Sequence, residues 1–170
     1  MTMNPLRLLM LIVLSALFSG CSSIGEALKT AGDFVTGSGV VRTSLDQITV
    51  VAKADANKTS ATAVDVVFIY DEKVPDLLPK DAADWFAQRD ELHANLWKYL
   101  DIASIEVPPA YIVDAVTLPK RYSTAIKVIA YANYLNKKGR KVIDLTTFKH
   151  AQLTLEAKTV DFAESTEGKS

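Results

Sequence analysis

The feature that most constrains this fold is a series of short runs in which apolar and polar residues alternate. Ala63–Tyr70, AVDVVFIY, places Val64, Val66, Phe68 and Tyr70 on one face. Alternation with period two is typical of strands that bury one face. We therefore expect a mainly β protein. Further runs of this kind cover residues 48–56, 102–107, 111–118, 141–145 and 151–157.

The run Ala125–Tyr134, AIKVIAYANY, is apolar on both faces and predicts a central strand that is covered on both sides. The basic segment 135–140, LNKKGR, then predicts a hairpin turn with Gly139 at positive φ. Two interpretations of its cations remain open: a contact with an anionic lipid or acidic partner, or a solvated tip that keeps a sheet edge soluble. These cations are Lys137, Lys138, Arg140 and the adjoining Lys141.

One stretch, 80–101, favours a long helix, with a break near Gln88 as an alternative. Asp81 is placed to cap its start, and its apolar residues recur at a spacing near 3.6. Such a stripe normally packs on a sheet, and the alternative for Trp85 and Trp97 is a partner groove.

About seven strands, one helical excursion and no βαβ alternation predict a β-sandwich with a helical insertion. We expect this domain to cover residues 47–160, with the insertion near 80–101. The polar connection 57–62 permits either a hairpin or a crossing between two sheets. Residues 161–170 are small, polar and charged, which predicts a disordered tail.

The N-terminus adds a separate constraint. Arg7 precedes the apolar run 8–18, LLMLIVLSALF, which is shorter than the roughly 20 residues that a spanning helix needs. With the small residues Ser19 and Gly20 after it, this layout predicts a secretory signal peptide over residues 1–20.

The segment 17–21, L-F-S-G-C, resembles a bacterial lipobox and ends at the single cysteine, Cys21. The resemblance implies diacylglycerol on the Cys21 thiol, cleavage before Cys21 and acylation of the new amine. Ser22 resembles the outer-membrane sorting pattern. Several acyl chains make a durable anchor, because each buried methylene adds about 0.8 kcal/mol. Residues 21–46 then form a lipidated, flexible tether about 25–30 Å from end to end. The alternative is an anchor helix with an incidental cysteine.

Composition excludes several function classes. With 19 basic and 20 acidic residues, the chain lacks the basic excess of a broad nucleic-acid interface. One cysteine excludes an intramolecular disulfide and a multi-cysteine metal site. No nucleophile motif or phosphate-binding glycine loop occurs, and the carboxylates of the helix fit a solvated face. We therefore predict no catalytic residue, no metal site and no cofactor except the lipid on Cys21.

Four strings in the mature region together resemble the TssJ lipoprotein family of type VI secretion systems. They are ADAN (54–57), VDVVFIYD (64–71), DWFAQRDEL (84–92) and KVIAYANYLNKKGRK (127–141). The resemblance implies a transthyretin-like β-sandwich of about seven to eight strands with an added helix, at the periplasmic face of the outer membrane. It also implies binding of the periplasmic C-terminal region of a TssM-type inner-membrane protein.

In that family the contact involves the loop between the first two strands, which implies a partner-binding role here for Asn57, Lys58, Thr59, Ser60, Ala61 and Thr62. Three departures indicate a divergent member or a paralogue with another partner. Lys58 stands where proline is frequent, Arg140-Lys141 where Trp-Arg is frequent, and Pro108-Pro109 where Pro-Gly is usual.

Two other functions remain open at this point. A periplasmic lipoprotein that binds a small ligand or lipid would need an apolar cavity inside its sandwich. An envelope enzyme would need polar side chains clustered around His93 or His150.

Overall fold

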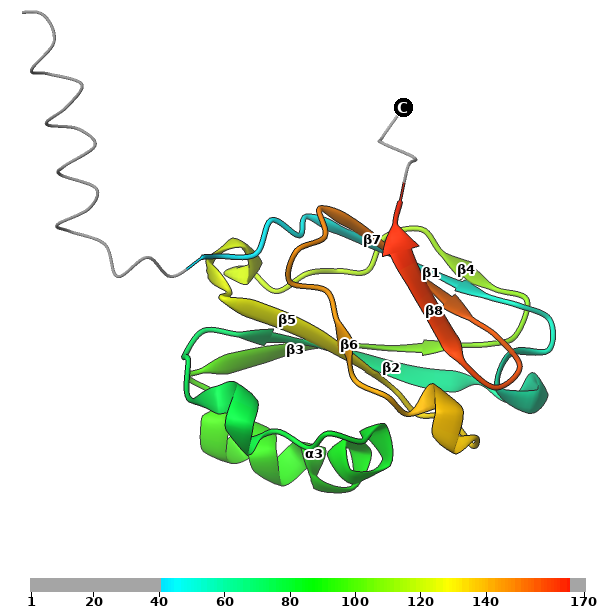
Figure 1. Ribbon diagram of the computed structural model, residues 1–170, viewed down its shortest axis with the longest axis horizontal. Coiled ribbons are helices and arrows are strands. Elements are labelled where there is room, and N and C mark those ends of the chain that lie inside the picture. Colours follow the sequence, from blue (N-terminus) through cyan, green and yellow to red (C-terminus); the bar gives the residue numbers. More distant parts are fainter. Residues whose placement is uncertain (1–40, 166–170) are drawn as a thin grey trace, which may run out of the picture. The chain divides into compact units, whose positions relative to one another are not determined.

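The computed structural model describes residues 41–165, which form two facing four-stranded sheets (Figure 1). This confirms the predicted mainly β sandwich with one helical insertion. The first sheet has the order β4-β1-β7-β8, with β4 at Ile112–Val113, β1 at Gln47–Ala52, β7 at His150–Leu155 and β8 at Val160–Glu164. The second has the order β3-β2-β5-β6, with β3 at Leu100–Val107, β2 at Thr62–Ile69, β5 at Lys127–Ala132 and β6 at Ile143–Asp144.

The alternating residues of β1 and β7 form one half of the core. The two strands run parallel, with Ile48 beside Ala151 and Val50 beside Leu153, and these four side chains are buried. The chain then crosses to the other sheet, because β2 pairs with β3 and β5 and not with β1. The crossing interpretation of the 57–62 connection is therefore correct.

Strand β5 lies between β2 and β6, and its consecutive residues 128–132 are all buried, which confirms a central strand that is covered on both faces. Val128 and Ala130 face the core between the sheets, whereas Ile129 and Tyr131 pack against a second cluster under the helix α3, Ala82–Leu96. The helix lies on the outer face of this sheet (Figure 1).

Helix α3 is continuous and shorter than predicted, and the break near Gln88 does not occur. Asp81 caps it, because the Asp81 carboxylate accepts a hydrogen bond from Ala83 N at 2.8 Å. The helix ends before residue 101 because Leu100 is already part of β3 and fully buried.

The structure corrects both predicted ends of the domain. The segment predicted as a disordered tail, 161–170, contributes its first four residues to β8, because they pair with residues 151–154 of β7. Residues 43–46, predicted as the end of the tether, belong to the folded domain, since Thr43 N donates to Ala125 O at 2.8 Å and Leu45 is buried in the core. Cys21 and the predicted signal peptide lie outside the described residues.

Two further expectations were wrong in detail. The strand predicted at 111–118 is reduced to β4, and Val116 N instead donates to Ile48 O at 2.9 Å. Gly139 does not have positive φ. Glycine is required there by packing, because a Cβ would lie 2.4 Å from Cγ of Tyr134.

Candidate docking loop

The connection between β1 and β2 contains a left-handed turn, η1, at Ala56–Thr59. Asn57, Lys58 and Thr59 have φ values of 45°, 56° and 64°. Consecutive left-handed residues other than glycine are strained, at roughly 1–2 kcal/mol each, and asparagine tolerates the conformation best. The surrounding contacts must therefore hold this turn in place.

Asn57 supplies those contacts. Its side chain is buried, donates through Nδ2 to Asn133 O at 3.2 Å, and accepts at Oδ1 from Leu135 N at 2.9 Å. Its backbone N–H donates to Glu156 O at 3.0 Å. One residue thus joins the β1–β2 connection to the β5–β6 and β7–β8 connections.

The β5–β6 connection is itself fixed. Arg140 Nε donates to Tyr134 O at 2.7 Å, and Arg140 Nη2 donates to Leu135 O at 3.1 Å. Tyr134 is buried and donates through its hydroxyl to Glu156 O at 2.8 Å. Burial, together with the charge of Glu156, raises the pKa of Tyr134, so the hydroxyl stays protonated as a donor.

The six predicted partner-binding residues therefore divide into two groups. Asn57 and Thr62 are buried and cannot face a partner. Lys58, Thr59 and Ala61 are exposed, and Ser60 is half-buried. The structure presents Lys58 and Thr59 at the tip of the turn, over the buried Asn57.

The partner-groove interpretation is wrong for Trp85. This side chain is fully buried, stacks on Tyr131 with ring centroids 4.7 Å apart, and donates through Nε1 to Asp65 Oδ2 at 2.8 Å. Asp65 is itself buried, and Arg89 lies 3.5 Å from the same oxygen. The hydrogen bond between Trp85 and Asp65 thus holds helix α3 on the sheet. The sequence indicated it only through Asp65, a single carboxylate within an otherwise apolar strand. Trp97, in contrast, is 59% exposed.

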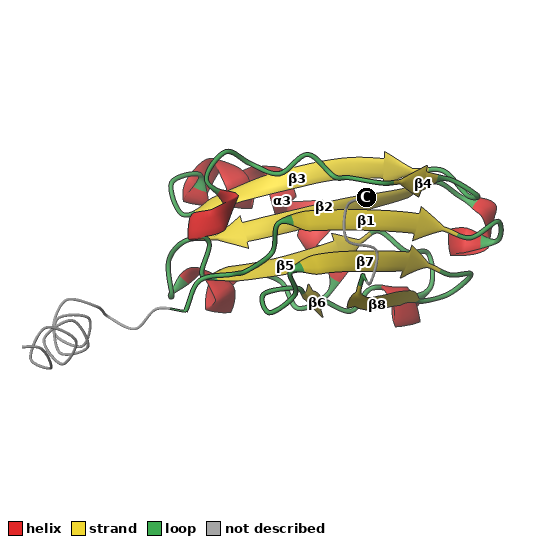
Figure 2. Cartoon of the chain, turned by 90° about the horizontal axis from the view of Figure 1, so that it is seen from above, coloured by secondary structure: helices red, strands yellow, loops and turns green. Residues whose placement is uncertain are grey.

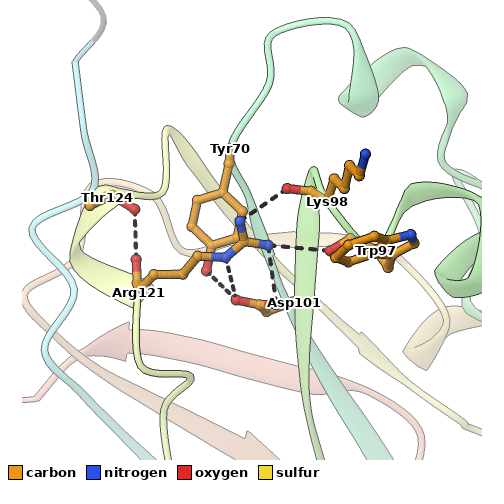
Figure 3. A network of polar contacts seen from close by, with 6 residues as sticks. All are labelled: Tyr70, Trp97, Lys98, Asp101, Arg121 and Thr124. Carbon is orange, nitrogen blue, oxygen red and sulfur yellow. Dashed lines mark hydrogen bonds and ion pairs between the residues drawn. The ribbon is translucent and has the colours of Figure 1, made fainter.

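A second polar network lies at the opposite end of the sandwich from η1 (Figures 1 and 3). Arg121 Nε donates to Asp101 Oδ2 at 2.8 Å, and the guanidinium lies 4.0 Å from the ring centroid of Tyr70. Arg121 also donates to the carbonyl oxygens of Lys98 and Trp97. The network therefore ties the loop after β4 to the end of α3, a role that no local pattern in the sequence indicates.

This environment shifts two pKa values. Burial raises the pKa of Asp101, but the hydrogen bonds from Arg121 and Tyr70 outweigh it and hold that pKa below its usual value. Burial, and then the hydrogen bond to Asp101, raises the pKa of Tyr70. Asp101 is therefore an ionised carboxylate that accepts hydrogen bonds from Tyr70 and Arg121, and its role is to hold these segments of the fold together.

The two histidines considered for catalysis lie in different parts of the fold, His93 on α3 and His150 at the start of β7. His150 Nε2 lies 2.9 Å from Asp46 Oδ1 at a strand end, whereas His93 lines a hollow of about 540 Å³ beside Asp101 and Arg121. That hollow lies at the margin of β3 and not between the sheets. Within residues 41–165, no group of three or more histidine, cysteine or acidic residues is arranged to hold a metal ion. No helix in the same range is long and apolar enough to cross a membrane.

No family model matches the chain, and no curated protein matches it in sequence. Solved structures do resemble it. The type VI secretion lipoprotein TssJ1 from Pseudomonas aeruginosa aligns over 72% of this chain and 96% of its own, with 14% identity and a TM-score of 0.53. Serratia marcescens Lip, a membrane-bound component of the type VI secretion system, aligns over 74% and 99%, with 12% identity and a TM-score of 0.47.

The likeness to TssJ1 concerns the fold, since the identity is low. It agrees with the β-sandwich that the sequence motifs predicted. The described part of the chain therefore has a TssJ-like β-sandwich fold.

Proposed function

We propose that the chain is a lipoprotein, anchored at the periplasmic face of the outer membrane by lipid on Cys21, in a type VI secretion membrane complex. There it docks the periplasmic C-terminal region of a TssM-type inner-membrane protein. The observation that carries this proposal is the η1 turn, which is exposed at Lys58 and Thr59 and fixed from below by Asn57. The fold shared with TssJ1, itself a type VI secretion lipoprotein, and the lipobox-like segment support the same role.

The geometry of η1 suits docking. A loop that is already held in its bound shape loses little conformational entropy when a partner binds. Strained backbone persists where surrounding contacts impose it and is concentrated at functional sites. The η1 turn has both properties, because three left-handed residues are held by hydrogen bonds to two other connections.

The anchor and the docking turn have separate roles. The lipid confines the protein to one membrane, and residues 22–42 would span about 25 Å as a flexible tether. Confinement of both partners to the envelope raises their effective concentration, so a moderate affinity is sufficient. The proposal contains no catalytic step.

The anchor is tested with Cys21→Ser in the producing bacterium. The variant should fold, remain in the soluble periplasmic fraction and fail to support secretion. Wild-type secretion by soluble protein would contradict the anchoring role.

The docking turn is tested by co-purification of the TssM-type protein from solubilised membranes. Lys58→Asp combined with Thr59→Asn suits the test, because both new residues tolerate left-handed φ. We expect at least a ten-fold loss of recovered partner. Lys120→Asp makes the same charge change at the opposite end of the sandwich and should have no effect. Equal recovery with both variants would refute the docking role of η1.

A further inference from the structure

One long edge of the sandwich is incomplete. β8 pairs with β7 alone, and β6 lies along the same edge in the facing sheet (Figure 2). β6 contains two residues, whereas β8 contains five. The short strand therefore cannot cover the whole inner face of β8.

Phe162 marks the uncovered part. It lies opposite Leu153 in the ladder, and Leu153 is fully buried, so both side chains point towards the inner face of the sheet. Phe162 packs edge-on against Phe148, with ring centroids 6.1 Å apart, yet remains 49% exposed. A half-exposed aromatic residue on an inner face indicates room for another element.

The backbone of β8 has hydrogen-bonding groups directed to this edge. Glu156 N donates to Thr159 O, and Ser165 N donates to His150 O. Since antiparallel bonding pairs recur at every second residue, the odd-numbered residues of β8 bond to β7. The residues whose N–H and C=O groups point away from the sheet are Val160, Phe162 and Glu164.

This edge has little of the usual protection. Proteins guard exposed edges with very short strands, bulges, proline or charged side chains. β4 and β6 are guarded by their length of two residues each. β8 has the sequence VDFAE and pairs in unbroken register, so it has neither proline nor a bulge. Its charged side chains are Asp161 and Glu164, and the Glu164 carboxylate already accepts hydrogen bonds from Lys149 N and His150 N.

A hollow of about 370 Å³ lies along this edge. Its floor includes the apolar side chains of Ile143 and Val160, and its lining includes two cations, Lys138 and Lys141, and one carboxylate, Asp161. Neither lysine forms an ion pair with any residue in 41–165. An apolar floor beside unpaired cations is complementary to a segment that carries both apolar and acidic side chains.

We propose that β8 accepts an extended acidic segment of a partner protein as an additional strand. The backbone of the segment bonds to the outward groups of β8, and an apolar side chain opposite Phe162 covers that residue. Acidic side chains two residues to either side lie on the same face, because alternate residues of a strand share a face, and they reach Lys138 and Lys141. This interaction uses other residues than the η1 turn and does not depend on the proposed docking of a TssM-type protein.

The test uses the full chain in detergent and two labelled peptides, Thr-Glu-Thr-Val-Thr-Glu-Thr and its counterpart with lysine in place of glutamate. In each peptide the valine and both charged residues lie on one face of the strand. Fluorescence anisotropy measures affinity, and residue-resolved amide hydrogen exchange locates the site. We expect the glutamate peptide to bind at least ten-fold more tightly. It should slow exchange at Val160 and Phe162, whereas Asp161 and Ala163 are protected in the free protein as well.

Variants separate backbone pairing from side-chain contact. Phe162→Pro removes an outward N–H and should abolish binding, whereas Phe162→Ala retains the N–H and should weaken binding only in part. Lys138→Glu with Lys141→Glu should remove the preference for the glutamate peptide. A glutamate peptide with alternate amides N-methylated should not bind the unmodified chain, which keeps the test valid if Phe162→Pro does not fold.

Three results would overturn the proposal. The first is unchanged exchange at Val160 and Phe162 with saturating glutamate peptide. The second is equal affinity for the glutamate and lysine peptides. The third is protection of these amides by mixed micelles that contain phosphatidylglycerol but not by the peptide, which would assign the edge to a lipid surface.

Discussion

Replacement of Asn57 tests how the η1 turn is held. Asn57→Ala removes two side-chain hydrogen bonds, to Asn133 O and from Leu135 N. At about 0.5–1.5 kcal/mol each, their loss costs about 1–3 kcal/mol. Alanine also adopts the φ of 45° less readily than asparagine, which adds about 1 kcal/mol. We therefore expect a decrease of about 2–4 kcal/mol in the free energy of unfolding.

Asn57→Gly separates the two contributions, because glycine loses the same hydrogen bonds but accepts positive φ without strain. It should therefore be about 1 kcal/mol less destabilising than Asn57→Ala. Urea unfolding followed by tryptophan fluorescence measures both variants, since Trp85 is buried. Equal stability of the alanine and glycine variants would refute the strain argument, and a loss below 0.5 kcal/mol in both would refute the anchoring role of the side chain.

Three further predictions concern the rest of the fold. Asp65→Ala leaves the buried Nε1–H of Trp85 without an acceptor and should cost about 2–3 kcal/mol, whereas Asp65→Asn keeps an acceptor and should cost less; unfolding curves compare them. Gly139→Ala places a Cβ against Tyr134 and should lower stability by about 1–3 kcal/mol, so an unchanged unfolding midpoint would contradict this packing. The pKa of Asp101 is held below its usual value, so its ionised form stabilises the fold above about pH 4, and this contribution is lost as the pH falls through the folded-state pKa. Arg121→Met should flatten that acid dependence in unfolding experiments between about pH 2 and pH 5, and an unchanged slope would exclude the ion pair as its source.

Local patterns predicted those features of the fold that depend on periodicity. The alternation in β2 and the two-sided apolar character of β5 reflect burial against one or two layers, and burial is directly visible in a sequence. The cap at Asp81 was also predictable, since it requires only residues three or fewer positions away.

Other features depend on residues that are distant in the chain. The sequence indicated the 57–62 loop through a family resemblance, but the division into buried Asn57 and exposed Lys58 depends on partners 76 and 78 residues further along. Similarly, Arg121 reaches Asp101 only because the fold brings two loops together. Short polar residues around Phe162 suggested disorder, yet pairing with β7 overrides that local preference.

Calorimetric titration of the chain with the purified periplasmic C-terminal region of the TssM-type protein from the same bacterium tests the central claim most directly. We predict saturable binding that is weakened at least ten-fold, or about 1.4 kcal/mol, by Lys58→Asp with Thr59→Asn. Lys120→Asp should leave the affinity unchanged. Absence of binding, or the same affinity with all three proteins, would contradict docking through the η1 turn.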